Sequence, residues 1–187
     1  MDTSLTLPAP VATARLQLLP CAPHLLDLLI AGPSTFTAAT GITVEDGYLE
    51  FPEALEMARQ CLLDADPDVA GWWAPWLFVH LADRALIGLG GFKGPPDPAT
   101  GVVEFGYGIA RARRGAGYAT EAARGLLETA FRLPGITGVC AHTLAEENAS
   151  TRVLVKAGLR RTAEIQDPAD GRLWRWEISR DVSPGEG

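Results

Sequence analysis

The segment that most constrains the fold is residues 102–123, VVEFGYGIARARRGAGYATEAA, in which a strand leads through a glycine-containing turn into a helix. Gly115 and Gly117 allow a tight turn whose backbone N–H groups point outward. Those amides and the positive end of the helix dipole form an anion site, to which Arg113 and Arg114 add charge and planar donors. The segment therefore predicts a pyrophosphate site, with a plain strand–turn–helix connection as the alternative.

Two other phosphate-binding motifs do not fit this segment. A dinucleotide-binding fingerprint needs a third glycine where Thr120 stands, and it needs the tight turn directly after the strand. A nucleoside-triphosphate loop needs Gly-Lys-Ser/Thr, which the sequence does not contain. Both classes of nucleotide site are excluded.

Hairpins dominate the pattern of the remaining elements, because apolar runs follow one another across short turns. We expect one domain over residues 1–187 with a core of about 12–181, of the α+β (mixed α/β) class, with a mixed, mostly antiparallel central sheet of six to seven strands and about four helices. Residues 34–50 lack periodicity and are expected to form a loop. Strands are expected at 15–19, 76–81, 86–92, 102–109, 138–144, 160–166 and 173–179, and helices at 22–30, from Pro52, at 117–131 and at 148–157.

The composition limits the classes of partner that we expect the protein to bind. The net charge of −7, from 23 acidic and 16 basic side chains, argues against a nucleic-acid surface. The N-terminal MDTSLTLPAP has neither a basic nor an apolar signal region, and no stretch is long enough to span a bilayer, so we expect no membrane partner and a cytoplasmic location. The three cysteines and three histidines show no metal-ligand spacing, so no metal is expected.

Two motifs together resemble a known family. RRGAGYATEA resembles the acyl-CoA pyrophosphate loop of the GNAT superfamily of N-acyltransferases, and ENASTRVLVKAGLRR resembles the Asn-x-x-Ser…Lys-x-Gly-Phe signature of its RimJ/RimL-like branch (ribosomal-protein N-acetyltransferase-like). The resemblance covers residues 15–179. The sequence departs from the family at Ala112, where glutamine or arginine is usual, at Leu159, which replaces phenylalanine, and at Leu154, where many members carry a tyrosine.

The resemblance implies a GNAT-type fold and acetyl-CoA as co-substrate. It implies direct transfer of the acetyl group, in a ternary complex, to a primary amine on a protein N-terminus or a small molecule. Ile109, Ala110 and Arg111 would lie along the pantetheine arm, and Asn148 would hold that arm beside the thioester. The residues expected around the pyrophosphate are Arg113, Arg114, Gly115, Ala116, Gly117, Tyr118, Ala119 and Thr120.

Two residues are the catalytic candidates. Glu104 is the expected general base, since family members often carry an acid on this strand, and it alternates onto one face with Gly106 and Gly108. A salt-bridged structural glutamate is the alternative. Ser150, one helical turn before Leu154, is expected to donate a proton to the departing thiolate, with helix capping as its alternative.

Several interpretations stay open at this point. Trp72, Trp73 and Trp76 either line the acceptor pocket or belong to the core, and Cys140 and His142 are interpreted as packing residues. Residues 34–50 and the DPADG turn are expected to select the acceptor. A catalytically silent acyl-CoA-binding module and a structural domain without cofactor are the competing functions. The oligomeric state is open, with a homodimer as one candidate.

Overall fold

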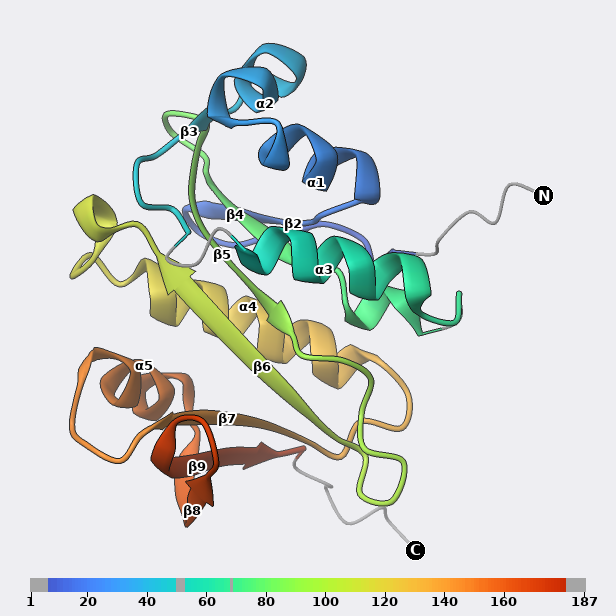
Figure 1. Ribbon diagram of the computed structural model, residues 1–187. Coiled ribbons are helices and arrows are strands. Elements are labelled where there is room, and N and C mark those ends of the chain that lie inside the picture. The colour runs from blue at the N-terminus through green and yellow to red at the C-terminus, as the bar shows by residue number, and fades with distance from the viewer. Residues whose placement is uncertain (1–6, 50–52, 68, 181–187) are drawn as a thin grey trace, which may run out of the picture.

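The computed structural model describes residues 7–49, 53–67 and 69–180, which form one mixed sheet flanked by helices (Figure 1). The sheet has the order β1-β2-β4-β5-β6-β7-β9-β8, with β3 added beside β5. Only the β3–β5 and β6–β7 pairs are parallel, which confirms the expected mostly antiparallel α+β class. The strands are β1 Val11–Ala12, β2 Leu16–Pro20, β3 Thr43–Val44, β4 Trp76–His80, β5 Ala85–Phe92, β6 Val102–Ile109, β7 Gly138–Leu144, β8 Arg160–Asp167 and β9 Gly171–Ser179.

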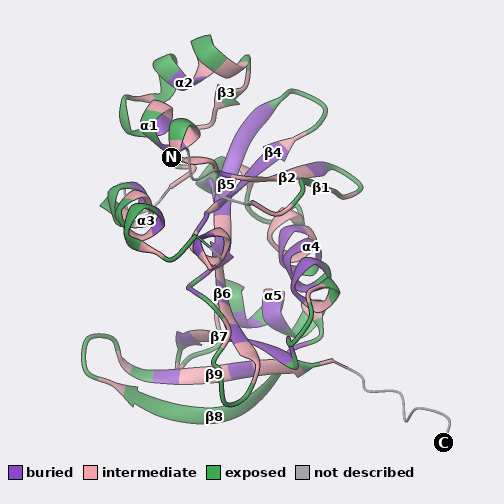
Figure 2. Cartoon of the chain, turned by 90° about the vertical axis from the view of Figure 1, so that its right-hand side faces the viewer, coloured by how far each residue is buried: buried purple, intermediate pink, exposed green. Residues whose placement is uncertain are grey.

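Helices cover both faces of the sheet. Figure 2 shows α1, α2 and α3 on one side of the strands and α4 and α5 on the other. Each side has its own hydrophobic cluster, with Phe105 and Leu126 among the residues on the α4 side and Leu55 and Leu77 on the α3 side. The α-helices are α1 Pro23–Ile30, α2 Pro33–Thr40, α3 Glu53–Asp64, α4 Tyr118–Arg132 and α5 Ala149–Ala157, and the short 3₁₀ helices are η1 Ala70–Trp72 and η2 Arg111–Arg113.

Small residues let α4 lie close to the sheet. Ala122, Ala123 and Gly125 are buried on one side of this helix. A Cβ added at Gly125 would come within 2.5 Å of Leu18 Cδ1, so a larger residue there would force the buried Leu18 side chain or the helix to shift. The close packing fixes the N-terminus of α4 relative to the end of β6.

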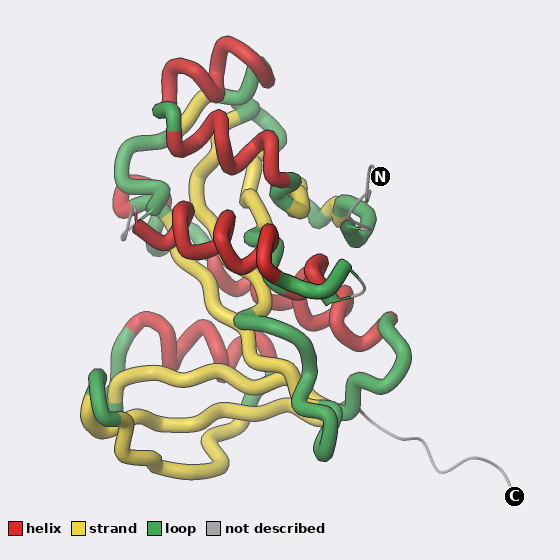
Figure 3. Tube along the Cα trace, turned by 45° about the vertical axis from the view of Figure 1, so that its right-hand side comes forward, coloured by secondary structure: helices red, strands yellow, loops and turns green. Residues whose placement is uncertain are grey.

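The two parallel central strands separate after a short paired stretch. β6 pairs with β7 only from Val102 to Glu104, opposite Gly138 to Cys140. Beyond that point β6 stays with β5 as far as Ile109, while β7 stays with β9 as far as Leu144. Figure 1 shows the two strands diverging, and Figure 3 shows the strands of the N-terminal half and those of the C-terminal hairpin as two groups joined there. The divergence opens the middle of the sheet.

The expectation of a loop over residues 34–50 is wrong in its first part. Helix α2 begins at Pro33, ends at Thr40, is capped by Gly41 with φ of 69°, and is followed by β3. The pattern was hidden because Phe36 is the one buried residue of α2, which leaves a helix of Thr, Ser and Ala without an apolar stripe. This helix brings the count to five, and the expected helix start at Pro52 lies outside the described residues.

The other expected elements lie within a few residues of their predicted bounds, and β6 and β7 match them fully. The sheet holds nine strands rather than six to seven, because β1 and β3 are two-residue strands too short to leave an apolar pattern. Among the described residues, no helix has the length and apolar character needed to cross a membrane.

Candidate active site

The glycine turn and the start of α4 form the wall of a hollow of about 330 Å³. Gly115 and Gly117 have φ of 81° and 87°, a left-handed conformation that glycine adopts without steric cost. Gly117 is the N-cap of α4, and no side chain caps this helix end. The first backbone N–H groups of α4 are therefore available to an anion, in the positive field of the helix.

Most of the residues expected around acetyl-CoA line this hollow. They are Ile109, Arg113, Arg114, Gly115, Gly117, Tyr118, Ala119 and Thr120. The other four expected residues are not among the described residues that line the hollow; they are Ala110, Arg111, Ala116 and Asn148. Helix α5 adds Arg152 and Lys156 from the opposite wall, which the sequence analysis did not identify. The hollow is therefore rich in cations and suited to a ligand with several phosphates.

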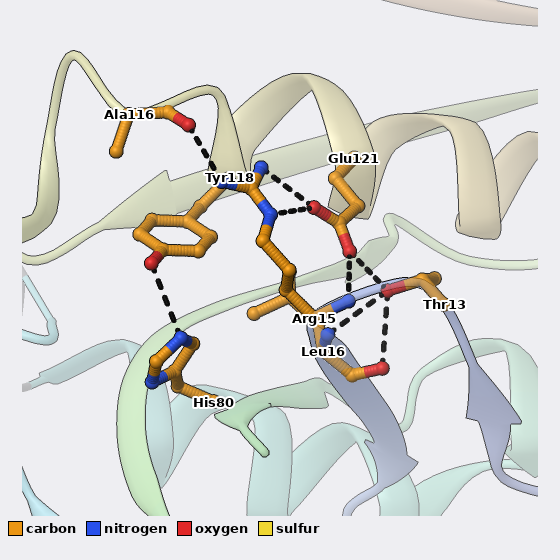
Figure 4. Close-up of polar contacts among 7 residues, drawn as sticks. All are labelled: Thr13, Arg15, Leu16, His80, Ala116, Tyr118 and Glu121. Carbon is orange, nitrogen blue, oxygen red and sulfur yellow. Dashed lines mark hydrogen bonds and ion pairs between the residues drawn. The ribbon is translucent and has the colours of Figure 1, made fainter. Parts of the chain in front are cut away.

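A network of polar contacts braces the turn against the start of β2 (Figure 4). Arg15 forms an ion pair with Glu121 at 2.7 Å and donates to the Ala116 carbonyl at 3.0 Å. Thr13 and the Arg15 backbone also donate to Glu121, each at 2.6 Å. The Arg15 guanidinium lies 4.3 Å from the ring centre of Tyr118, whose hydroxyl is 3.1 Å from His80 Nε2. The backbone of the turn is thus held by side chains from distant parts of the chain.

These contacts determine the ionisation of Glu121. Burial alone would raise the pKa of this carboxyl, but the hydrogen bonds from Thr13 and from the backbone and side chain of Arg15 outweigh burial and lower the pKa. Glu121 also stands in the first turn of α4, where a negative charge is stabilised by the helix dipole. Its role in the structure is to anchor Arg15 beneath the turn.

Arg113 faces both the hollow and a pair of carboxylates. Its guanidinium lies 2.7 Å from Glu45 and 2.8 Å from Asp83, so two acidic groups hold it at the side of the turn. Asp83 in turn lies 2.8 Å from His80 Nδ1, which connects Arg113 to the network of Tyr118. The structure therefore gives Arg113 a bracing contact that its position in the motif did not reveal.

A second, smaller cavity of about 100 Å³ occupies the gap between the separated strands. Part of its lining comes from side chains on the sheet face that is covered by α4 and α5, namely Phe105, Tyr107 and Thr143. Another part of the lining comes from the opposite face of the sheet, namely Lys93, Gly106 and His142. We call this cavity the passage, since its lining comes from both faces of the sheet. The full lining is Lys93, Phe105, Gly106, Tyr107, Ala141, His142, Thr143, Ser150 and Leu154.

Ser150 lines both the hollow and the passage. Helix capping, its alternative role, falls instead to Asn148, whose side-chain oxygen accepts from the Thr151 backbone at 3.1 Å in a capping box. Tyr107 lines the same two spaces and donates to the Ser150 carbonyl at 3.3 Å. Burial raises the pKa of Tyr107, so its hydroxyl keeps its proton at neutral pH. Two hydroxyl groups, one of them not expected, therefore reach this junction.

Glu104 lies on the face opposite α4 and makes two contacts. Its Oε1 is 2.6 Å from Lys93 Nζ and 3.0 Å from His142 Nδ1. Burial would raise the pKa of Glu104, but the hydrogen bonds from Lys93 and His142 outweigh it and lower the pKa. Nε2 of His142 is buried and has no hydrogen-bond partner among the described residues. Beyond packing, the role expected for it, His142 therefore contacts the candidate base.

The structure places Trp72 and Trp76 in the core, and it packs the partly buried Trp73 against the second hydrophobic cluster. Trp76 is fully buried, and Trp72 packs edge-on against Phe92 with ring centres 5.1 Å apart, so both belong to the core. Trp73 lines a separate groove beside α3.

Lys93 and His142 were missed because neither carries a motif, and the signal that could have found them is their place on the same sheet face as Glu104.

Comparison with known proteins identifies the class to which this fold and site belong. Residues 34–160, more than half of the 187-residue chain, match the family described as the acetyltransferase (GNAT) domain. The chain belongs to this family of acetyltransferases. No curated protein sequence matches it significantly.

Solved structures share the fold at low sequence identity. The ribosomal-protein-S5-alanine acetyltransferase from Vibrio fischeri aligns with a TM-score of 0.68 and 13% identity, over 94% of this chain and 98% of its own. RimL, a ribosomal L7/L12 alpha-N-protein acetyltransferase solved with coenzyme A, aligns with a TM-score of 0.65 and 13% identity, over 92% and 99%. A GNAT-family acetyltransferase from Bacillus anthracis aligns with 0.63 and 16%, over 91% and 98%. The neighbours thus include the RimJ/RimL-like branch.

Proposed function

We propose that the protein transfers the acetyl group of acetyl-CoA to a primary amine by direct attack in a ternary complex. The observation that carries the proposal is the passage, which shares Tyr107 and Ser150 with the cationic hollow and is lined on the other face by Lys93 and His142, the two residues that contact Glu104. A thioester held from one face can meet an amine that arrives from the other. The structural neighbours named as a ribosomal-protein-S5-alanine acetyltransferase and a ribosomal L7/L12 alpha-N-protein acetyltransferase support the same reaction type.

Coenzyme A would bind along the hollow. The pyrophosphate would accept hydrogen bonds from the uncapped N–H groups of α4 and from the turn at Gly115 to Gly117, with Arg114, Arg152 and Lys156 nearby. Pantetheine would run past Ile109, Ala110 and Arg111 at the end of β6 toward the passage. Asn148 would approach this arm from the start of α5.

The proton transfers would occur on the two sides of the thioester. The amine nitrogen attacks the carbonyl carbon, forms the new C–N bond and loses a proton to Glu104, which His142 and Lys93 keep ionised. The C–S bond then breaks, and the thiolate takes a proton from the Ser150 hydroxyl. Ser150 regains a proton from solvent and Glu104 releases its proton to solvent, so both side chains return to their starting state. The products are the N-acetyl amine and coenzyme A.

Two assays separate this reaction from the alternatives. Acetyl-CoA should raise the melting temperature, because it binds only the folded chain, and an amine panel should show amine-dependent release of free thiol. A raised melting temperature without thiol release from any amine would identify the silent acyl-CoA-binding module. An unchanged melting temperature at saturating acetyl-CoA would contradict cofactor binding altogether.

A further inference from the structure

We propose that the acceptor is a small primary amine with an apolar body, bound in a groove between α3 and the sheet; this rests on the acetyl transfer proposed above. The groove has a volume of about 450 Å³, within the range of about 300–1,000 Å³ typical of small-molecule sites. Helix α3 forms one wall, Trp73 and Pro75 form another, and the end of β5 forms the floor. The lining residues are Leu49, Ala54, Leu55, Met57, Ala58, Cys61, Trp73, Pro75, Leu89, Gly90, Gly91, Phe92, Lys93 and Gly106.

The groove meets the passage at one end. Lys93 and Gly106 line both spaces, and Lys93 Nζ is 2.6 Å from Glu104. Gly106 leaves this junction open, since the nearest group to a Cβ placed there would be Lys93 Cε at 3.5 Å. A ligand lying in the groove would therefore have its amine beside the candidate base and its body along α3. The route from the cationic hollow through the passage to the groove is continuous in its lining residues.

The walls specify the chemistry of the ligand body. Lys93 is the single charged side chain among the described residues that line the groove, and the others are aliphatic, aromatic, glycine, proline, methionine or cysteine. The backbones of Gly90 and Gly91 are already paired within the sheet. An apolar body gains free energy by leaving water here, whereas peptide amides or a second ammonium group would lose water without finding partners.

These features favour a monoamine over a peptide N-terminus or a polyamine. At the inner end the Glu104 carboxylate lies behind Lys93, where it can accept a hydrogen bond from one amine, and nothing in the described lining suits a charge farther out. Met57, 66% exposed at the rim, offers a flexible apolar contact for the outer part of the ligand. Of the two segments expected to select the acceptor, residues 34–50 contribute Leu49 to the groove, whereas the DPADG turn contributes no described lining residue, and α3 and Trp73 supply most of the walls.

The test is a chain-length series of acceptors of similar basicity. Ethylamine, butylamine and hexylamine are assayed with saturating acetyl-CoA, and kcat/KM should rise about fourfold per methylene, the factor that corresponds to burial of one CH₂ group. Diaminobutane and a short peptide with an N-terminal alanine form the comparison arms and should be poor acceptors. A series without dependence on chain length, or a preference for the peptide or the diamine, would overturn the groove assignment.

Variants locate the effect in the groove. Ala58→Phe should fill it and lower kcat/KM for hexylamine at least tenfold, with ethylamine little affected. Met57→Lys at the exposed rim should act in the same direction without disturbing the core. Leu63→Phe is the matched control, since Leu63 lies exposed on the same helix outside the groove lining.

The outcomes keep the two proposals apart. Acetylation of ethylamine and hexylamine at equal kcat/KM, unchanged by Ala58→Phe and Met57→Lys, overturns the groove and leaves acetyl transfer standing. No acetylation of any amine, with a normal response of the melting temperature to acetyl-CoA, overturns acetyl transfer and the groove together.

Discussion

Glu104 combines two properties that a proton acceptor for an amine needs. It is ionised at neutral pH because Lys93 and His142 lower its pKa. It also shares a face of β6 with Gly106 and Gly108, whose lack of side chains leaves room beside it. The salt-bridged glutamate considered from the sequence and the catalytic glutamate are therefore not exclusive. The ion pair is the means by which the carboxylate stays ready on a partly buried face.

Glu104→Gln tests the base. The variant keeps the shape of the side chain but cannot take a proton, so turnover at neutral pH should fall by about 10²–10⁴-fold with acetyl-CoA affinity unchanged. Rising pH should narrow the gap because more amine arrives neutral. The gap should also narrow in acid, as the wild-type carboxyl is protonated, at a pH below the ordinary glutamate range because its pKa is lowered.

A matched carboxylate controls for general effects of charge on this face. Glu177 lies on β9 and pairs with Arg175, and Glu177→Gln should leave turnover near the wild-type value. Near-native rates in Glu104→Gln across the pH range would place the base elsewhere. Glu45 and Asp46 would be the next candidates, and Glu50 lies outside the described residues.

The residue that donates a proton to the thiolate can be identified by comparing two variants that each lack one hydroxyl group. Ser150→Ala should lower kcat by roughly 10²-fold or more with little change in acetyl-CoA affinity, because a proton donor acts on the transition state selectively. Tyr107→Phe removes the other hydroxyl of the junction, which donates to the Ser150 carbonyl, and should cost less. Full kcat in Ser150→Ala and a large loss in Tyr107→Phe would transfer the role to Tyr107.

At the scale of elements, the site consists of two helix starts facing a strand end. The sequence predicted β6, α4 and α5 well because each has an apolar pattern and a terminal signal, such as Gly117 before α4 or Asn148 before α5. It could not predict the contacts made by Lys93 and His142, or those between Arg113 and Glu45. The pairs His142–Glu104 and Arg113–Glu45 join elements far apart in the chain. The Lys93–Glu104 pair joins consecutive strands and depends on the register of β5 against β6, which is set by the folded sheet.

The start of α4 gives a direct test of phosphate binding. Gly117→Val introduces a β-branched residue at φ of 87° and places a side chain where the pyrophosphate would approach. We expect at least a tenfold loss of coenzyme A affinity by calorimetry. Gly171→Val is the control, because Gly171 has a similar φ of 77° in the distant β8–β9 turn. Equal coenzyme A affinity in the two variants would contradict the assignment.

The brace beneath the turn predicts a pH-dependent contribution to stability. Glu121→Gln removes an ion pair and charged hydrogen bonds, and should lower the free energy of unfolding at neutral pH by about 1–3 kcal/mol. Because the folded pKa is lowered, this contribution is present above the ordinary glutamate pKa and is lost as pH falls through the lower folded value. Glu128→Gln, on the exposed side of the same helix, should change little. A pH-independent difference between Glu121→Gln and wild type would contradict the electrostatic origin.

At the scale of the whole molecule, β6 and β7 join the two parts of the sheet through only three residue pairs, beyond which the strands separate. A ligand that contacts β6, α4 and α5 would add contacts across this junction. At a hundredfold excess over its dissociation constant, acetyl-CoA should stabilise the folded chain by about 2.7 kcal/mol. That corresponds to a rise in melting temperature of roughly 5–10 °C for a chain of this size, measurable by calorimetry.

The central claim is that the acetyl group crosses the sheet, from acetyl-CoA on the α4 side to an amine on the α3 side. The most direct measurement is mass spectrometry of an alkylamine incubated with the protein and acetyl-CoA deuterated in the acetyl group. The account predicts an N-acetyl amine that carries the label, formed by the wild type and reduced in both Gly117→Val and Glu104→Gln. Label that stays on coenzyme A, or appears only as acetate at a rate independent of the amine, would contradict it.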